Sequence, residues 1–256
     1  MLLVIDAGNT NITLGVFEDD DLIVQWRIVT DHDKGSDAYA LALRNLFESA
    51  DIDLTKIHAA VIASVVPPLD QTLKRMVQQC FAVTPLFINH TVDTGLKILY
   101  DSPGDVGADR IVDAVAAVTK YGAPCIVVDF GTATTFNVIN ADREYLGGVI
   151  APGIMISAEA LFMRAAKLPR VEIKRPDKVI GSSTVRAMQS GLYHGYAGLV
   201  DGVLERVIAE LGTKPHVIAT GGLAPLIATA SKFIEKVDGT LTLDGLRLVY
   251  ERSKRV

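Results

Sequence analysis

The chain has 256 residues, 49 % of them hydrophobic, and a formal net charge of −5. That length and composition are enough for two domains with separate cores, while the acidic balance gives no general attraction to nucleic acid or anionic lipid. No apolar run approaches the ~20 residues that a membrane span needs, and Met1 leads into an apolar strand without the basic segment of a signal peptide. We therefore expect a cytoplasmic protein that binds neither nucleic acid nor membrane.

The cysteines and histidines do not suggest a metal centre. Cys80 and Cys125 have no CxxC partner and each lies among apolar residues, so both are expected to be buried free thiols. The five histidines show no ligand spacing either.

The N-terminal 17 residues have the pattern of a strand, a polar turn and a second strand. Residues 2–5 are a continuous apolar run that ends at an acidic residue, and apolar residues alternate with small or polar ones after the turn. A glycine in the turn lets backbone approach a ligand, hydroxyl and amide groups suit an anion, and a carboxylate suits a phosphate-bound Mg²⁺. The residues of this candidate phosphate site are Asp6, Ala7, Gly8, Asn9, Thr10, Asn11, Ile12 and Thr13.

The same pattern recurs at residues 125–138, where an apolar strand ends in Asp129, Phe130, Gly131 and Thr132 and a threonine-rich strand follows. Two such units, one opening each half of the chain, predict a duplicated protein with two lobes and a nucleotide between them. A further strand and Gly-Gly turn at residues 216–225 could seat the flat face of a nucleoside against bare backbone.

The remaining periodicity alternates helices and strands, which is typical of an α/β protein. Ser36 is expected to cap a helix, and Met155, Leu161, Phe162 and Met163 are expected to fill a core. In the first half we predict strands over 22–29, 59–66 and 85–88 and helices from 36, from 67 to about 80 and from 108 to 122. In the second half we predict a strand over 144–150 and helices over 154–166, 184–211 and 242–251.

Asp109 and Arg110 lie in the first turn of the helix predicted to join the two halves. One interpretation is structural: Asp109 complements the helix dipole and Arg110 pairs on the surface. A side chain at the start of this helix would, however, point toward the predicted nucleotide, so we favour a catalytic role.

The long helix predicted over 184–211 contains Gly191, Gly195, Gly198 and Gly202. Glycine at such spacing costs helix stability, so these positions are expected to allow close packing against another helix, for which a second subunit is a candidate.

The motifs together resemble those of one kinase family. Their order resembles the actin, Hsp70 and sugar kinase superfamily, in which two ribonuclease-H-like domains close on ATP. Over essentially the whole chain they resemble type III pantothenate kinase, and the matching segments are DAGNTN (6–11), SVVP (64–67), GADR (107–110), DFGTATT (129–135), GG (147–148), PG (152–153) and Thr184. The resemblance implies an N-terminal domain at 1–116 and a C-terminal domain at 117–256, whose last helix packs back towards the first.

The resemblance also implies an activity, which is transfer of phosphate from ATP to the terminal hydroxyl of pantothenate, the first step of coenzyme A biosynthesis. Asp109 would accept the proton of that hydroxyl, and its orientation would matter more than its basicity because the proton leaves late in a loose transition state. Residues 6–13 and Thr132 would bind ATP, with Asp6 placing Mg²⁺. Pantothenate would be bound by Tyr100, Gly107, Ala108, Asp109, Arg110 and Thr184.

Two further properties come from the resemblance alone. Family members require a monovalent cation, potassium or ammonium, and Asp129 matches the residue that binds it. They are homodimers, which agrees with the glycine-spaced helix.

Two other interpretations stay open. The first keeps the fold and changes the acceptor, giving another small-molecule kinase or a phosphatase of the same superfamily. The second is a non-catalytic nucleotide-binding factor that assists transcription. Loss of Asp109, or a basic surface rich in aromatic residues, would favour the second, and the sequence has neither feature.

Overall fold

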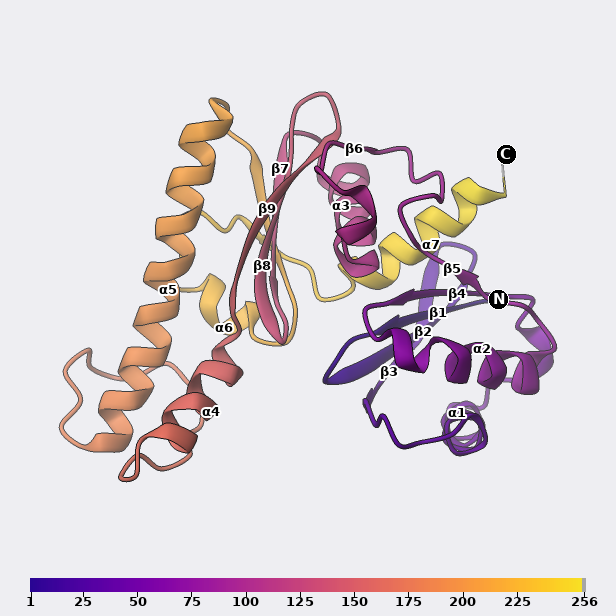
Figure 1. The fold of residues 1–256 in the computed structure, drawn as a ribbon, viewed down its shortest axis with the longest axis horizontal. Helices are drawn as coiled ribbons and strands as arrows, with labels where there is room; N and C mark the ends of the chain where they lie inside the picture. Colours follow the sequence, from indigo (N-terminus) through magenta and orange to yellow (C-terminus); the bar gives the residue numbers. More distant parts are fainter. Residues whose placement is uncertain (255–256) are drawn as a thin grey trace. The chain divides into compact units, whose positions relative to one another are not determined.

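A computed structural model describes residues 1–254 of the chain (Figure 1). The chain divides into two compact units, which are described separately. Unit 1 comprises Met1–Leu96, Asp101–Ala116 and the segment from Thr242 onward, and unit 2 comprises Lys97–Tyr100 and Ala117–Leu241. Among the described residues, no helix combines the length and the apolar character needed to cross a bilayer.

Unit 1 is built on a five-stranded sheet in the order β3-β2-β1-β4-β5. The first three strands pair antiparallel, whereas β4 pairs parallel with β1 and β5 pairs parallel with β4. β1 is central and almost wholly buried, as its apolar run predicts. The strands are β1 (Leu2–Ala7), β2 (Asn11–Glu18), β3 (Asp21–Val29), β4 (Ala59–Ser64) and β5 (Leu86–Phe87).

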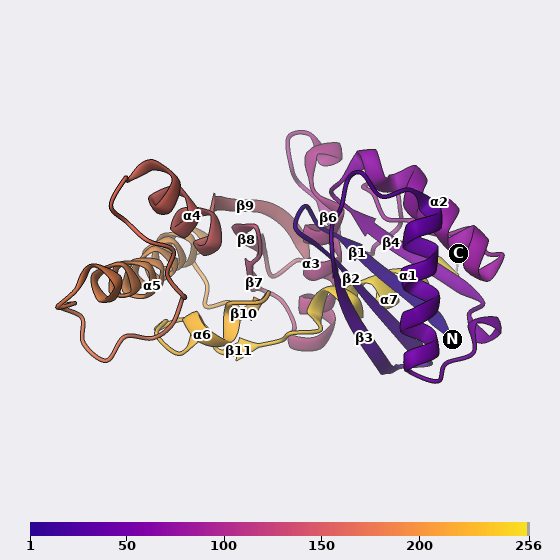
Figure 2. The same cartoon turned by 90° about the horizontal axis from the view of Figure 1, so that it is seen from below.

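Helices cover both faces of this sheet (Figures 1 and 2). One core joins the sheet to α1 (Ser36–Ser49) and α2 (Pro67–Phe81), with Phe47 and Leu73 fully buried. A second core joins the other face to the first turns of α3 (Ala108–Tyr121) and to α7 (Leu241–Ser253). Two 3-10 turns, Leu54–Lys56 and Pro103–Asp105, complete the unit.

Unit 2 is built on a six-stranded sheet in the order β11-β10-β7-β8-β9-β6. From β9 to β11 the order and directions repeat those of unit 1 from β3 to β5, and the two-residue β6 is added at the edge. The strands are β6 (Lys97–Ile98), β7 (Cys125–Phe130), β8 (Ala133–Ile139), β9 (Glu144–Pro152), β10 (His216–Thr220) and β11 (Lys236–Val237).

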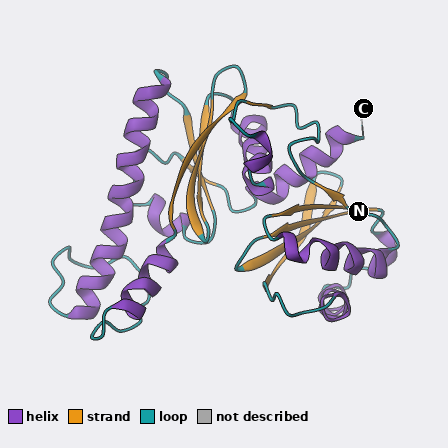
Figure 3. Ribbon diagram, in the orientation of Figure 1, coloured by secondary structure: helices purple, strands orange, loops and turns teal. Residues whose placement is uncertain are grey.

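The helices of unit 2 are α4 (Ile154–Arg164), α5 (Thr184–Leu211) and α6 (Ala224–Ala228) (Figure 3). α5 lies along the second sheet, and Val200 and Leu204 are fully buried in the shared core. Its bounds confirm the predicted helix over 184–211. Both cysteines are free: Cys125 is buried, as predicted, whereas Cys80 is only half-buried.

Two predictions about helix residues were wrong. Ser36 does not cap α1, because the helix already includes it and the capping position is Gly35. The apolar residues of α4 do not fill a core: Met155 is 60 % exposed and Met163 is 67 % exposed. Only Ile154, at the start of α4, is buried, since the helix packs through its first turns and the rest carries its apolar side chains on the surface.

The glycines of α5 do not pack against another helix of the described chain. A Cβ at Gly191, Gly195 or Gly198 would meet no atom within 4 Å, and one at Gly202 would meet only the end of the Arg206 side chain. The helix continues without a break because its inner face buries large side chains in the unit 2 core.

α7 packs closely on α3, and this contact makes a testable prediction. A Cβ at Gly245 would lie 2.1 Å from the carbonyl oxygen of Val112. Gly245→Ala is therefore expected to lower the free energy of unfolding by about 1–3 kcal/mol, although alanine favours helix. Thermal and urea unfolding would measure this change.

Gly239→Ala is the matched control, because a Cβ there meets nothing within 4 Å. It should leave the free energy of unfolding within about 0.5–1 kcal/mol of the wild type. Equal stability of the two variants would contradict the packing of α7 on α3.

Candidate active site

The first candidate phosphate turn is a well-supported hairpin of unit 1. The backbone N–H of Gly8 donates to the Asn11 carbonyl at 3.0 Å, and the Thr30 hydroxyl donates to the Gly8 carbonyl at 2.6 Å. Asn9 and Thr10 are exposed at the tip, whereas the side chains of Ala7 and Ile12 belong to the core. Residues 6–13 therefore form one continuous structure, to which Ala7 and Ile12 can offer only backbone groups.

Asp109 folds back over the start of α3, also in unit 1. Its Oδ1 accepts a hydrogen bond of 2.7 Å from the backbone N–H of Arg110. A Cβ at Gly107 would lie 2.5 Å from the same oxygen, so a side chain at this position would displace the carboxylate from the place it occupies. Arg110 is 7 % exposed. Burial raises the pKa of Asp109 above its ordinary value, against the lowering effects of the Arg110 N–H and guanidinium.

Val65, immediately after β4, lies next to both groups of unit 1. Its N–H donates to the Ala7 carbonyl at 3.0 Å, and its side chain is 3.3 Å from the place of a Cβ on Gly107. The phosphate turn and the start of α3 therefore share a neighbour. Sequence reasoning noticed Val65 within the SVVP segment but gave it no role in the site.

In unit 2, Asp129 is the second-last residue of β7 and lies between two glycines. A Cβ at Gly131 would lie 3.2 Å from Asp129 Oδ2, and a Cβ at Gly221 would lie 2.5 Å from Asp129 Oδ1. Gly221 has φ +90°, a conformation that also favours glycine. The Thr132 residue that follows is exposed. The sequence does not predict this arrangement, because Gly131 and Gly221 lie some 90 residues apart in the chain. The glycine turn at 216–225 was the one sequence feature that pointed to it.

Tyr100 and Thr184 also belong to unit 2 but to different elements. The ring of Tyr100 covers Gly147, where a Cβ would lie 3.2 Å from Tyr100 Cε2, and its centroid is 6.5 Å from that of Tyr145. Thr184 is the exposed first residue of α5, which Ser183 caps. The position of the Tyr100 ring is thus fixed by its contact with Gly147. The roles of Tyr100 and Thr184 in binding stay predictions.

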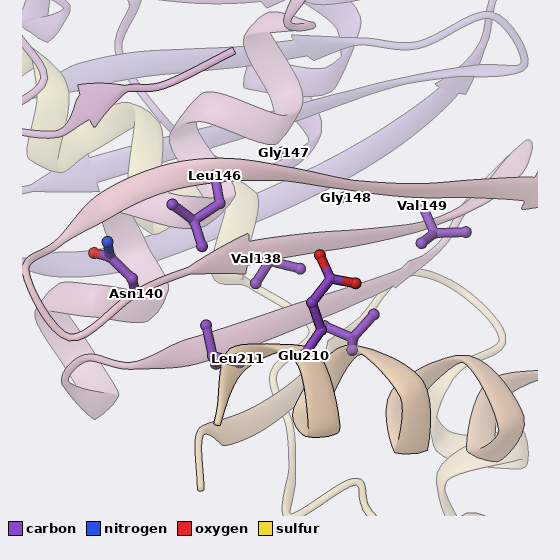
Figure 4. Close-up of a pocket in the computed structure, with 9 residues that line it drawn as sticks. Val138, Asn140, Leu146, Gly147, Gly148, Val149, Glu210 and Leu211 are labelled. Atoms are coloured by element: carbon purple, nitrogen blue, oxygen red, sulfur yellow. The ribbon is translucent and has the colours of Figure 1, made fainter. Parts of the chain in front are cut away.

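A pocket of about 420 Å³ lies elsewhere in unit 2, and none of the predicted site residues lines it. Figure 4 shows it between β8, β9 and the end of α5, with Leu146 and Glu210 on opposite sides. Within residues 1–254, no group of three or more histidine, cysteine or acidic side chains could hold a metal ion.

Comparison with solved structures identifies the class of the fold. The chain superposes on a ROK family glucokinase from Streptomyces griseus, solved with glucose and AMPPNP, with a TM-score of 0.54 and 13 % identity, covering 99 % of this chain and 100 % of that one. It superposes on a protein described as a Baf family transcriptional activator from Campylobacter jejuni with a TM-score of 0.61 and 20 % identity, covering 99 % and 100 %. The mixed α/β fold is therefore that of the sugar kinases and their structural relatives.

Sequence comparison identifies the family. The model of type III pantothenate kinase matches residues 2–206. The type III pantothenate kinase of Koribacter versatilis is 56 % identical, over 99 % of this chain and 96 % of its own, and that of Halalkalibacterium halodurans is 53 % identical, over 99 % and 100 %. The chain belongs to the type III pantothenate kinase family, as its motifs predict, and this makes it a kinase.

The raised pKa of Asp109 predicts a pH dependence of stability. The folded protein holds the Asp109 proton more tightly than the unfolded chain does. Below the ordinary pKa of 3.8 the carboxyl is protonated in both states, and burying it costs no charge. As the pH rises toward and through the pKa of the folded state, the free energy of unfolding falls because a charged carboxylate must be buried. Asp109→Asn removes that cost, so the variant should gain stability relative to the wild type as the pH rises from about 4 to 7. Urea unfolding across this range measures the difference.

Asp238→Asn provides a control of opposite sign. Burial alone raises the pKa of Asp238, but the Lys120 ammonium at 2.6 Å and the Tyr121 hydroxyl at 2.8 Å outweigh it and hold the pKa below its ordinary value. The wild type should therefore be more stable than this variant above the ordinary pKa and lose that advantage as the pH falls. Parallel pH profiles for the two variants would contradict the assignment.

Proposed function

We propose that the chain is a pantothenate kinase that transfers the γ-phosphate of ATP to the terminal hydroxyl of pantothenate, the first step of coenzyme A biosynthesis. The observation that carries the proposal is family membership along the whole chain, with relatives named type III pantothenate kinase at 50–56 % identity. The repeated strand order of the two sheets supports a duplicated protein. The domains proposed at 1–116 and 117–256 differ from the two compact units, because residues 97–100 belong to unit 2 and the segment from Thr242 belongs to unit 1.

In this proposal residues 6–13 bind the phosphates of ATP. The exposed amide and hydroxyl groups of Asn9 and Thr10 and the bare backbone at Gly8 suit an anion. The Asp6 carboxylate, at the end of β1, fits the single protein ligand that Mg²⁺ commonly takes beside phosphate oxygens. A magnesium ion held there would supply neutralisation of charge on the phosphates, and Thr132 would add a contact to ATP.

Asp129 is the proposed ligand of a monovalent cation, potassium or ammonium. The two glycines beside it support this role, because Gly131 and Gly221 keep side-chain atoms away from both carboxylate oxygens. Any Cβ at Gly221 would occupy the space beside Oδ1.

Asp109 is the proposed proton acceptor, and Tyr100, Gly107, Ala108, Arg110 and Thr184 complete the acceptor site. Burial makes Asp109 a stronger base than an exposed carboxylate, and the hydrogen bond from the Arg110 N–H fixes its orientation. In a loose transition state the hydroxyl proton leaves late, so orientation contributes more than basicity. The Arg110 guanidinium suits the carboxylate of pantothenate or the transferring phosphate.

The homodimer is proposed on the outer face of α5. This helix is held to unit 2 by its inner face, while a Cβ at Gly191, Gly195 or Gly198 would meet no atom of the described chain within 4 Å. α4, which packs against the same core, exposes Met155 and Met163. A bare helix face beside exposed apolar side chains is what a second copy of the chain would bury.

The function is tested by ADP release from MgATP with pantothenate as acceptor, in potassium and in sodium buffer. We expect turnover that needs pantothenate and is faster in potassium. Asp109→Asn should lower kcat by about 10²–10⁴-fold while nucleotide binding is retained, since only the proton acceptor is lost. ATP binding without phosphorylation of pantothenate in either buffer would mean another acceptor or an accessory role.

The dimer is tested by the molecular mass in solution. Wild type should have twice the mass of the chain, and Gly195→Trp should shift it toward the monomer because a single chain has room for the ring and a packed partner helix has none. Gln71→Trp, at an exposed site of α2, adds the same bulk and should leave the mass unchanged. A dimeric Gly195→Trp variant would exclude this face.

A further inference from the structure

Tyr196 is a buried tyrosine in the middle of α5, 8 % exposed and part of the unit 2 core. Its hydroxyl lies 3.0 Å from the Pro152 carbonyl oxygen and 3.1 Å from that of Gly153, and it also meets the Ser157 hydroxyl. Pro152 is the last residue of β9, Gly153 is the capping residue that follows it, and Ser157 lies in α4, so the partners surround the β9–α4 turn. A helix side chain thus holds the backbone of a turn that is 43 residues away in the sequence.

That turn packs directly against the second candidate phosphate turn. A Cβ at Gly153 would lie 2.1 Å from the Thr132 carbonyl oxygen and 2.7 Å from that of Gly131. Pro152 is also paired with Ala133 in the β8–β9 ladder. The peptide units of Gly153 and Thr132 therefore lie against each other with no side chain between them, and a shift of one displaces the other.

We propose that Tyr196 is a positioning residue for nucleotide binding: through the carbonyls of Pro152 and Gly153 it holds the Gly131–Thr132 turn in the conformation that receives ATP. The inference rests on the proposed ATP contact of Thr132. Tyr196 itself touches neither Thr132 nor, on this account, the nucleotide; it acts through the turn.

The hydroxyl is the part of Tyr196 that matters for this role. The ring is core and would remain in a phenylalanine, whereas the hydrogen bonds to the two carbonyls would be lost. The Gly153 carbonyl would keep the hydrogen bond from the Ser157 N–H at 3.0 Å, so loss of the Tyr196 hydroxyl loosens this carbonyl without leaving it unpaired. Because the Thr132 turn rests on Gly153, the loosening passes to the proposed ATP contact of Thr132 and not to the residues of unit 1 that are proposed to bind the ATP phosphates.

The test compares the Kd of MgATP, measured by calorimetry without pantothenate, for the full chain and for Tyr196→Phe. We expect the variant to bind about five- to tenfold more weakly, which is the effect of one buried hydrogen bond. In steady-state assays the KM for ATP should rise by a similar factor, while the KM for pantothenate at saturating ATP stays unchanged.

Tyr193→Phe is the matched control. Tyr193 lies on the same helix, is 2 % exposed, and its hydroxyl bonds to Thr229 at 3.2 Å, away from the turn. Both variants should lose similar thermal stability, but Tyr193→Phe should bind ATP within about twofold of the wild type. An equal loss of ATP affinity in both variants, or no loss in Tyr196→Phe, would overturn the inference.

Gly153→Ala tests the same connection without altering Tyr196. Its Cβ must displace the Thr132 carbonyl, so it should weaken ATP binding more than Tyr196→Phe does, and wild-type affinity in this variant would also overturn the inference. A wild-type protein that binds ATP but does not phosphorylate pantothenate overturns the proposed function alone, because the Kd comparison still decides the role of Tyr196. A wild-type protein that binds no ATP overturns both.

Discussion

Backbone packed directly against backbone is the constraint on which the second candidate phosphate turn depends. Gly153 lies against the Thr132 peptide and Gly221 lies against Asp129 and the backbone of Phe130, at distances where a Cβ would overlap carbonyl, amide or carboxylate atoms. Contacts this close leave the turn few alternative positions. The same contacts make the turn sensitive to the groups that hold the opposite backbone, and the Gly153 carbonyl is held by the Tyr196 hydroxyl together with the Ser157 N–H.

The helix α3 shows how neighbouring acidic residues can take different roles. Asp113 is 2 % exposed and accepts a hydrogen bond of 2.7 Å from the Thr242 hydroxyl, which fastens α3 to α7. Asp109, one turn earlier, receives the Arg110 N–H but has its pKa raised by burial. The carboxylate engaged by another element stabilises the position of the helix, whereas the pKa of the other is raised because its burial outweighs its local hydrogen bonds.

Local patterns predicted most of the fold and the first phosphate turn. Three elements were predicted correctly because each depends on residues that are neighbours in the sequence. They are the apolar strand β1, the helix over 184–211 and the end of α3 before Gly122. The two-residue strands β6 and β11 were not, since a strand of that length has no periodicity. Nor could sequence show that Gly221 is packed on Asp129, because contacts between distant segments leave no local pattern.

The exposure of the apolar residues of α4 was also not predicted. The reason is the same: a local pattern does not show which distant segments pack against it. The composition of α4 predicts a core helix, yet Met155 and Met163 face outward because the unit 2 core is already filled by the inner face of α5. Hydrophobic periodicity indicates that a face is apolar and does not say which surface covers it.

α5 has two faces with opposite chemistry, and it carries both the proposed dimer surface and the proposed positioning residue Tyr196. Tyr193 and Tyr196 point inward from the same helix whose Gly191 and Gly195 are open on the outside. A 28-residue helix is a stiff element, so a partner that fixes its outer face also limits the movement of the Tyr196 hydroxyl inside. If a second copy of the chain binds there, association would steady the Pro152–Gly153 carbonyls and, through them, the Thr132 turn. Subunit association and nucleotide affinity should then be coupled, with the dimer binding ATP more tightly than the separated chain.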